Sequence, residues 1–175
     1  MSLLARLGLG PSRRPTSKPD DDLVSVVQTR LGRLPADRAE MIAAFAGLLI
    51  RVAHADDEVS EVEAVALRRL VDEHADLGAD ETEAVATLVT SHLARMAGIE
   101  YSRLTRAMNA HASPEEKLRL LDCLYAMATA DDIVTVVEEE QIRAVARALM
   151  LSHTQLIEVR KRYADQLEVL RGLPR

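Results

Sequence analysis

Cysteine is almost absent from this 175-residue chain, which contains only Cys123. One cysteine cannot form an internal disulfide framework or a zinc site built from several cysteines. Cys123 lies in an apolar stretch, so we expect it to be an ordinary core residue. The five histidines show no H-E-x-x-H or comparable spacing, so the chain has none of the common zinc-ligand patterns.

Aromatic residues are equally scarce. They make up 2% of the chain, with three tyrosines, one phenylalanine and no tryptophan. Strands favour aromatic and β-branched residues, whereas alanine and leucine are the strongest helix formers. Alanine and leucine together supply 51 of the 175 residues. The composition therefore predicts an all-α protein.

Long apolar runs are also missing. The longest, Met41 to Ile50, is about half of what a bilayer span needs, so it predicts a buried helix segment rather than an integral membrane helix. The N-terminus has neither an apolar stretch nor a cleavage site typical of a signal peptide, which favours a cytoplasmic protein. Weak peripheral association with a membrane surface stays open because the leader combines leucines with arginines (Leu3, Leu4, Leu7, Leu9, Arg6, Arg13, Arg14).

The chain lacks a surplus of positive charge. Its 22 basic and 28 acidic residues give a net charge of −6, which argues against a nucleic-acid partner. It also contains no G-x-S-x-G motif, no phosphate-binding loop and no dinucleotide fingerprint. We therefore expect a non-enzymatic protein.

Residues 1–21 are rich in glycine, proline and polar residues and predict a flexible leader, followed by a single domain at 22–171. The domain is expected to be a compact bundle of about seven or eight helices. Capping patterns mark several starts, among them Ser60 with Glu63, Asp80 with Glu83, and Ser113 followed by Pro114 and Glu116. The predicted helices span 22–33, 36–55, 60–74, 80–96, 101–110, 113–130, 135–149 and 152–170.

The most informative pattern is an internal repeat. Residues 49–63 (LIRVAHADDEVSEVE) match residues 124–138 (LYAMATADDIVTVVE) at eight of fifteen positions when shifted by 75. Further along, Leu77 aligns with Leu149 at an offset of 72, which predicts a loop three residues shorter in the second copy. We expect two units, 36–96 and 113–170, that pack about a pseudo-two-fold axis.

Each unit contains the motif A-D-D-x-V-[ST]-x-x-E at a corner between two helices. The paired motif resembles the tellurite-resistance TerB family and the related N-terminal domain of DjlA-type co-chaperones, over roughly residues 36–165. The family pattern has glycine where this chain has Asp57 and Asp132, and the chain contains no J domain. The resemblance implies a compact helical domain linked to tellurite and other stress responses, with acidic residues that bind a divalent cation. The motif residues are Ala55, Asp56, Asp57, Val59, Ser60, Glu63, Ala130, Asp131, Asp132, Val134, Thr135 and Glu138.

The two aspartates of each corner follow a helix C-terminus, where the helix dipole disfavours negative charge. The start of the next helix, with Glu63 or Glu138 as its capping carboxylate, would offset that cost. An arginine (Arg51, Arg68 or Arg143) is a second candidate. The third is a calcium or magnesium ion held by the corner carboxylates, whose candidate ligands are Asp56, Asp57, Glu63, Asp131, Asp132 and Glu138.

The resulting hypothesis is a TerB-like module that binds a divalent cation, a protein partner or both. Acidic residues outnumber basic ones in the segment 54–83, while 150–175 is slightly basic, a polarity that suits partner docking. Two alternatives stay open. One is a metal-dependent hydrolase that uses the paired carboxylates, and the other is a structural homodimerisation domain.

Overall fold

The computed structural model describes residues 34–52, 61–96, 101–129 and 134–167, with the backbone alone at 61–64 and 90–96. These ranges form helices and no strand, so the predicted all-α fold is confirmed. The predicted leader, the predicted helix at 22–33 and the Ser60 cap lie outside the described residues. The elements are α2 (Ala36–Val52), α3 (Glu61–His74), α4 (Ala79–Met96), α5 (Tyr101–His111), α6 (Pro114–Ala128), α7 (Val136–Ala148), α8 (His153–Lys161) and the 3-10 turn η2 (Ala164–Gln166).

Helix α2 is the central element. The apolar run from Met41 to Ile50 is buried throughout, because α4, α5, α6 and α7 all pack against it. A helix that is apolar on every side is stable in water only when neighbours surround it. The longest apolar run of the sequence is therefore a buried helix segment, as predicted, and it lies at the centre of the core.

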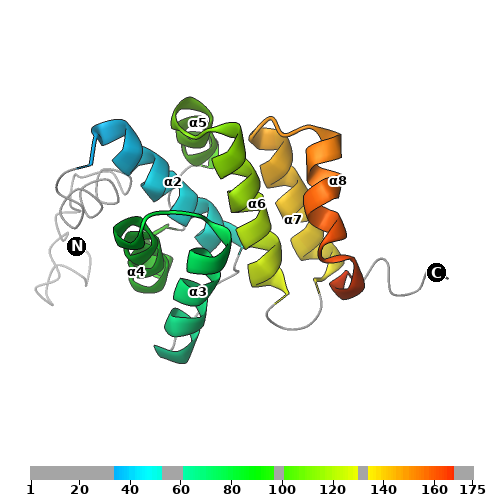
Figure 1. The fold of residues 1–175 in the computed structure, drawn as a ribbon, viewed down its shortest axis with the longest axis horizontal. Coiled ribbons are helices and arrows are strands. Elements are labelled where there is room, and N and C mark those ends of the chain that lie inside the picture. The colour runs from blue at the N-terminus through cyan, green and yellow to red at the C-terminus, as the bar shows by residue number, and fades with distance from the viewer. Residues whose placement is uncertain (1–33, 53–60, 97–100, 130–133, 168–175) are drawn as a thin grey trace, which may run out of the picture.

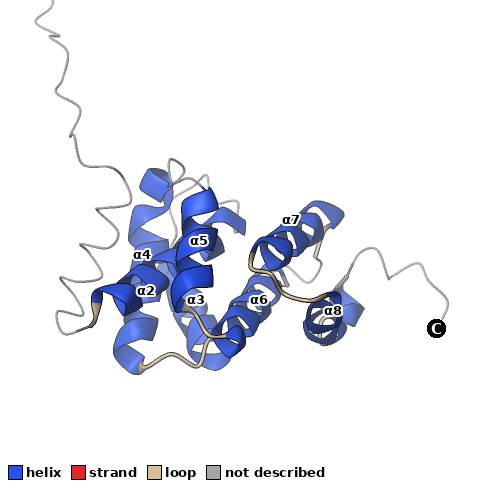
Figure 2. Cartoon of the chain, turned by 90° about the horizontal axis from the view of Figure 1, so that it is seen from above, coloured by secondary structure: helices blue, strands red, loops and turns tan. Residues whose placement is uncertain are grey.

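Helix α6 lies between the group formed by α2 to α5 and the pair α7 and α8 (Figures 1 and 2). Two contacts of the first unit have counterparts in the second: α2 packs against α4 as α6 packs against α8, and α3 packs against α6 as α7 packs against α2. Exchanging the first set of helices for the second preserves these contacts, as a pseudo-two-fold arrangement would. The packing of α3 on α4 and of α6 on α7 has no counterpart of similar extent.

The turns after α3 and α7 show how the two copies correspond. Asp76 (φ 51°) and Met150 (φ 61°) are the non-glycine residues with a left-handed backbone in the described part of the chain. Each lies two residues after its helix ends, at a shared offset of 74. The predicted offset of 72 was wrong, because α7 is one residue shorter than α3 and the following turns have equal length.

Capping boxes start three of the helices. In each box the two side chains accept hydrogen bonds from each other's backbone N–H, as predicted. The pairs are Ser113 with Glu116, Thr135 with Glu138, and Ser152 with Gln155. The predicted box of Asp80 with Glu83 was wrong. Helix α4 begins at Ala79, and the Gly78 N–H donates to Glu81 Oε2 (3.3 Å). A glycine gives no side-chain signal at the N-cap, which is why the start was placed two residues late.

Helix α8 ends at Lys161, not at Leu170 as predicted. Beyond it the chain turns through η2, and Leu167, fully buried, takes an extended conformation beside Val134. The cause is tertiary, because the ring of Tyr163 stacks on Tyr125 with 5.4 Å between centroids. A helix that continued past Lys161 would carry these apolar groups away from α6.

We expect Thr135→Ala to lower the free energy of unfolding by about 0.5 to 2 kcal/mol, because it removes the acceptor of the Glu138 N–H at the start of α7. Thr154→Ala, an exposed site inside α8, is the matched control and should change it by less than about 0.5 kcal/mol. Urea denaturation of both variants measures the difference. Equal stabilities would contradict a stabilising cap at Thr135.

Candidate functional site

The second acidic corner joins two fixed points of the backbone. On one side Thr129 caps α6, and its N–H donates to Tyr125 O (3.0 Å). On the other side the Val134 N–H donates to Gln166 O (2.9 Å), and Val134 is buried. The two candidate ligands of this corner, Asp131 and Asp132, occupy the short span between these points in the sequence.

Glu138 is the one candidate ligand whose side chain the structure describes. Its Oε2 accepts hydrogen bonds from the Thr135 N–H (2.9 Å) and the Thr135 hydroxyl (2.7 Å), while the Glu138 N–H donates to Thr135 Oγ1 (3.2 Å). The predicted capping role of Glu138 is therefore confirmed. A carboxylate held in this way also points its charge at the positive end of α7.

The other candidate ligands fall outside the described residues. These are Asp56, Asp57, Asp131, Asp132 and the side chain of Glu63, whose backbone lies in the first turn of α3. Across the described ranges, no group of three or more histidine, cysteine, aspartate or glutamate residues is arranged to hold a metal ion.

Two of the arginines proposed to offset the corner charge have other contacts. Arg68 pairs with Glu83 at 2.8 Å on the surface. The Arg51 guanidinium lies over the ring of Tyr101, with 5.0 Å to the centroid. Within the described structure, these contacts therefore join α3 to α4 and α2 to α5.

Two valines at the start of α7 are exposed beside the second corner. Val136 and Val137 are 56% and 62% exposed. They directly follow the capping residue Thr135, so in the sequence these exposed apolar residues lie close to the two aspartates of the corner. Two adjacent exposed valines are a small patch, and they give the corner an apolar as well as an acidic side.

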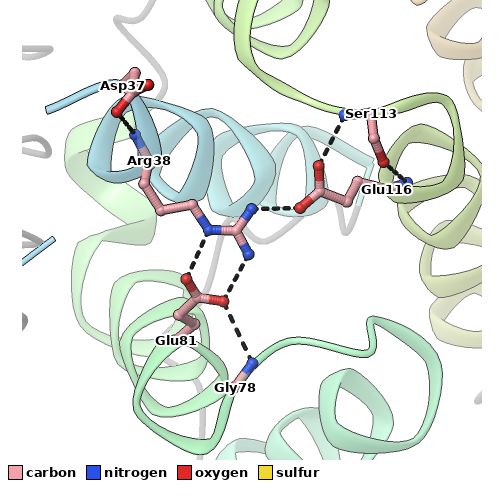
Figure 3. Close-up of polar contacts among 6 residues, drawn as sticks. All are labelled: Asp37, Arg38, Gly78, Glu81, Ser113 and Glu116. Atoms are coloured by element: carbon pink, nitrogen blue, oxygen red, sulfur yellow. Dashed lines mark hydrogen bonds and ion pairs between the residues drawn. The ribbon is translucent and has the colours of Figure 1, made fainter. Parts of the chain in front are cut away.

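A partly buried guanidinium connects three helices at the other end of the molecule (Figure 3). Arg38, in the first turn of α2, makes two parallel hydrogen bonds to Glu81, from Nε to Oε1 and from Nη2 to Oε2, both 2.7 Å. Its Nη1 also donates to Glu116 Oε1. Glu81 and Glu116 occupy equivalent positions, because Glu81 is the third residue of α4 and Glu116 is the third residue of α6. Arg38 thus joins the N-termini of two helices to a third.

The ion pairs change the acidity of both carboxyls. Hydrogen bonds from Arg38 lower the pKa of Glu81 despite its partial burial. Burial alone would raise the pKa of Glu116, but hydrogen bonds from Arg38 and from the Ser113 backbone outweigh it, so that pKa is lowered as well. Both groups are therefore charged at neutral pH, and the pKa of Arg38 is raised in return.

A buried carboxylate, Asp122 on α6, receives donors from both sides. Its Oδ2 lies 2.7 Å from His74 Nδ1 at the end of α3. Its Oδ1 accepts from Arg162 Nη1 (3.0 Å) and from the Tyr163 hydroxyl (3.1 Å). Burial, followed by the charge of Asp122, raises the pKa of Tyr163, so the phenol stays protonated and remains a donor. Asp122 is 8% exposed, and these donors compensate the loss of its hydration.

Sequence reasoning missed both polar clusters. The partners of Arg38 lie 43 and 78 residues away, so no local pattern indicates the contact. Asp122 did leave a signal, because an acid stands between Leu121 and Cys123 in an apolar stretch. Cys123 itself is fully buried, and burial raises the pKa of its thiol to about 12, in keeping with the predicted core role.

Comparison with known proteins gives one match. The family model described as tellurite resistance protein TerB matches residues 41–161, more than half of the chain. No curated protein and no solved structure matches the chain. Among the described helices, none is both long enough and apolar enough to cross a membrane.

We expect Arg38→Met to lower the free energy of unfolding at pH 7 by about 2 to 3 kcal/mol, because it leaves two partly buried carboxylates without their partner. Arg69→Met is the matched control and should have almost no effect, since the Arg69 side chain is 81% exposed in its pair with Glu73.

The difference between parent and Arg38→Met should depend on pH. The pKa values of Glu81 and Glu116 are lowered on folding, so their contribution is present above the unfolded pKa and is lost as pH falls through the folded values. The stability gap should therefore be largest near pH 7 and shrink below about pH 4. A gap independent of pH, measured by urea denaturation at several pH values, would contradict the ionic role.

Proposed function

The chain belongs to the TerB family, and from this premise we propose that it is a non-enzymatic cytoplasmic module of the tellurite and stress response. In this proposal the two acidic corners bind a divalent cation, calcium or magnesium, and the corner surface binds a protein partner. The cation ligands would come from Asp56, Asp57 and Glu63 in the first corner and from Asp131, Asp132 and Glu138 in the second.

One observation carries the cation part of the proposal. The backbone is held by hydrogen bonds at Thr129 and at Val134, and the sequence between them contains two adjacent carboxylates. Calcium and magnesium both prefer carboxylate oxygens, and fixed flanks lower the entropy lost when such ligands close around an ion. A cation would also offset the repulsion between Asp131 and Asp132.

The partner part of the proposal rests on the start of α7. Val136 and Val137 are exposed there, and the capping box holds the helix start that presents them. Exposed apolar side chains bordered by carboxylates suit a partner surface with an apolar centre and basic edges. A cation at the corner would change the charge of this surface and therefore its affinity for such a partner.

The experiment compares thermal stability at increasing calcium or magnesium concentration for the parent and for Asp56→Asn/Asp131→Asn. We expect the parent to gain stability with the logarithm of ion concentration, about 2.7 kcal/mol at one hundred times the dissociation constant. The double variant should lose this gain. In chelator it should be more stable than the parent, because repulsion between neighbouring carboxylates is relieved.

The two stability curves should therefore cross as the ion concentration rises. Asp72→Asn/Asp80→Asn removes the same charge from exposed sites on α3 and α4 and should follow the parent curve. Parallel curves for the parent and the Asp56→Asn/Asp131→Asn variant would contradict the cation site.

A further inference from the structure

The large apolar side chains that stay exposed lie mostly at the two ends of one helix. In the described part of the chain they number four, and three of them flank α7. Val136 and Val137 lie at its start and are 56% and 62% exposed, while Met150 follows its end and is 81% exposed. Figure 2 shows α7 at the edge of the bundle. Both ends of an outer helix therefore present apolar groups to solvent.

The backbone does not explain the methionine at the end of α7. Met150 has φ 61°, and its N–H donates to Arg147 O (3.1 Å) where the helix closes. Glycine is the usual residue at such a position, because a side chain on a left-handed residue costs free energy. The Met150 side chain is almost fully exposed, so it stabilises neither the turn nor the core. A contact outside the monomer would account for it.

The two ends of α7 also differ in charge. The helix has three glutamates in its first half, and both of its bases, Arg143 and Arg147, in its second half. Glu140 and Arg147 are the most exposed of these, at 61% and 62%, and they pair with each other at 2.9 Å. An ion pair as exposed as this one is weak, so its members exchange partners at little cost. The start of α7 is therefore apolar and acidic, and its end is apolar and basic.

These two ends match each other when two copies of α7 lie antiparallel. Val137 lies seven residues before Ala144 and Met150 six residues after it, while Glu140 lies four residues before it and Arg147 three after it. At a rise of about 1.5 Å per residue, the members of each pair lie at similar distances from Ala144. A two-fold axis near Ala144 therefore places Val137 opposite Met150 of the second copy and Glu140 opposite Arg147.

We propose that the chain forms a homodimer in which α7 packs antiparallel against α7 of a second copy. This inference rests on the partner part of the proposed function, which requires an apolar surface with basic edges next to the start of α7. The end of α7, with Met150 beside Arg143 and Arg147, has that chemistry. The partner of this surface is therefore the same surface on another copy, turned through the two-fold axis.

Both ends of α7 are held in the position that such a contact needs. The capping box of Thr135 and Glu138 fixes the start, and the Asn109 side chain on α5 donates to Ala148 O (2.9 Å) at the end. A helix fixed in this way loses little conformational entropy when it associates. One helix from each copy makes a small interface, so we expect a dimer in measurable equilibrium with the monomer.

Charge reversal tests the contact. Glu140→Arg leaves only basic side chains opposite each other near the centre of the paired helices, and Arg147→Glu leaves only acidic ones. Sedimentation equilibrium should show each variant dimerising at least about tenfold more weakly than the parent. An equimolar mixture of the two variants should regain the dimer, because every facing pair then joins opposite charges. The double variant Glu140→Arg/Arg147→Glu should also dimerise by itself, as antiparallel helices require.

The matched control reverses the charges of an exposed pair on α3. Arg69→Glu and Glu73→Arg act on side chains that are 81% and 61% exposed, so they leave the core intact, as the α7 variants do. Each control should dimerise like the parent, and mixing the controls should change nothing. Equal weakening by the controls, or an α7 mixture that stays monomeric, would overturn the proposal.

Met150→Gly should have two effects of opposite sign. It removes the apolar contact, so the dissociation constant of the dimer should rise by at least about tenfold. It also relieves the left-handed backbone, so the melting temperature of the dilute monomer should rise. Val65→Ala trims an exposed valine on α3 and should leave the dissociation constant unchanged. An unchanged dimer in Met150→Gly would contradict the proposed packing.

The oligomeric state in chelator and in calcium chloride separates this inference from the proposed function. A parent that dimerises in chelator supports the inference whether or not calcium stabilises the chain. A dimer that forms only with calcium supports the inference and the cation site together. A parent that stays monomeric up to about 1 mM in both conditions overturns the inference. The calcium titration of Asp56→Asn/Asp131→Asn then still decides the cation site independently.

Discussion

One guanidinium connects three helices of the bundle. Arg38 neutralises two carboxylates at the starts of α4 and α6, and each of these also accepts a backbone N–H of its own helix start. Either glutamate alone would stabilise its helix through the dipole. Two such carboxylates close together in a partly buried site would repel each other. The Arg38 guanidinium lies between them and binds both, so it offsets this repulsion. The N-terminal ends of α2, α4 and α6 are therefore joined by a single side chain.

Asp122 has the corresponding role between the two repeated units. It is a buried anion on α6, and its donors come from α3 on one side and from the chain after α8 on the other. Such a charge is costly to bury without partners, so an arrangement that separated these elements would leave it unpaired. The cluster thus links α3, α6 and the chain after α8 through one carboxylate.

The Asp122 cluster explains why two units of similar sequence differ in the lengths of α4 and α8. The local parts of the units agree, since both have a helix, a left-handed residue and a second helix whose third residue closes a cap. The two units differ after α8, where the Tyr163 ring stacks on Tyr125 and the Tyr163 hydroxyl donates to the buried Asp122 carboxylate on α6. The energy of that contact exceeds the small preference for adding further helical turns to α8.

The sequence by itself determined the fold class, the core helix and the three capping boxes that contain a serine or threonine. Each of these depends on residues within a turn or two of one another, as with Thr135 and Glu138, so a pattern in the chain is enough to predict it. The TerB resemblance was also visible in the paired motif and agrees with the family match.

Only the tertiary structure decided the contacts of Arg38, the pairing of His74 with Asp122 and the end of α8. Arg38 contacts Glu116, which lies 78 residues away in the sequence, and no local pattern near either residue predicts this contact. The sequence after Lys161 continues a helical pattern, and α8 stops there because Tyr163 gains more from α6 than from another turn. Local propensities differ by less than about 1 kcal/mol per residue, so a single buried contact outweighs them.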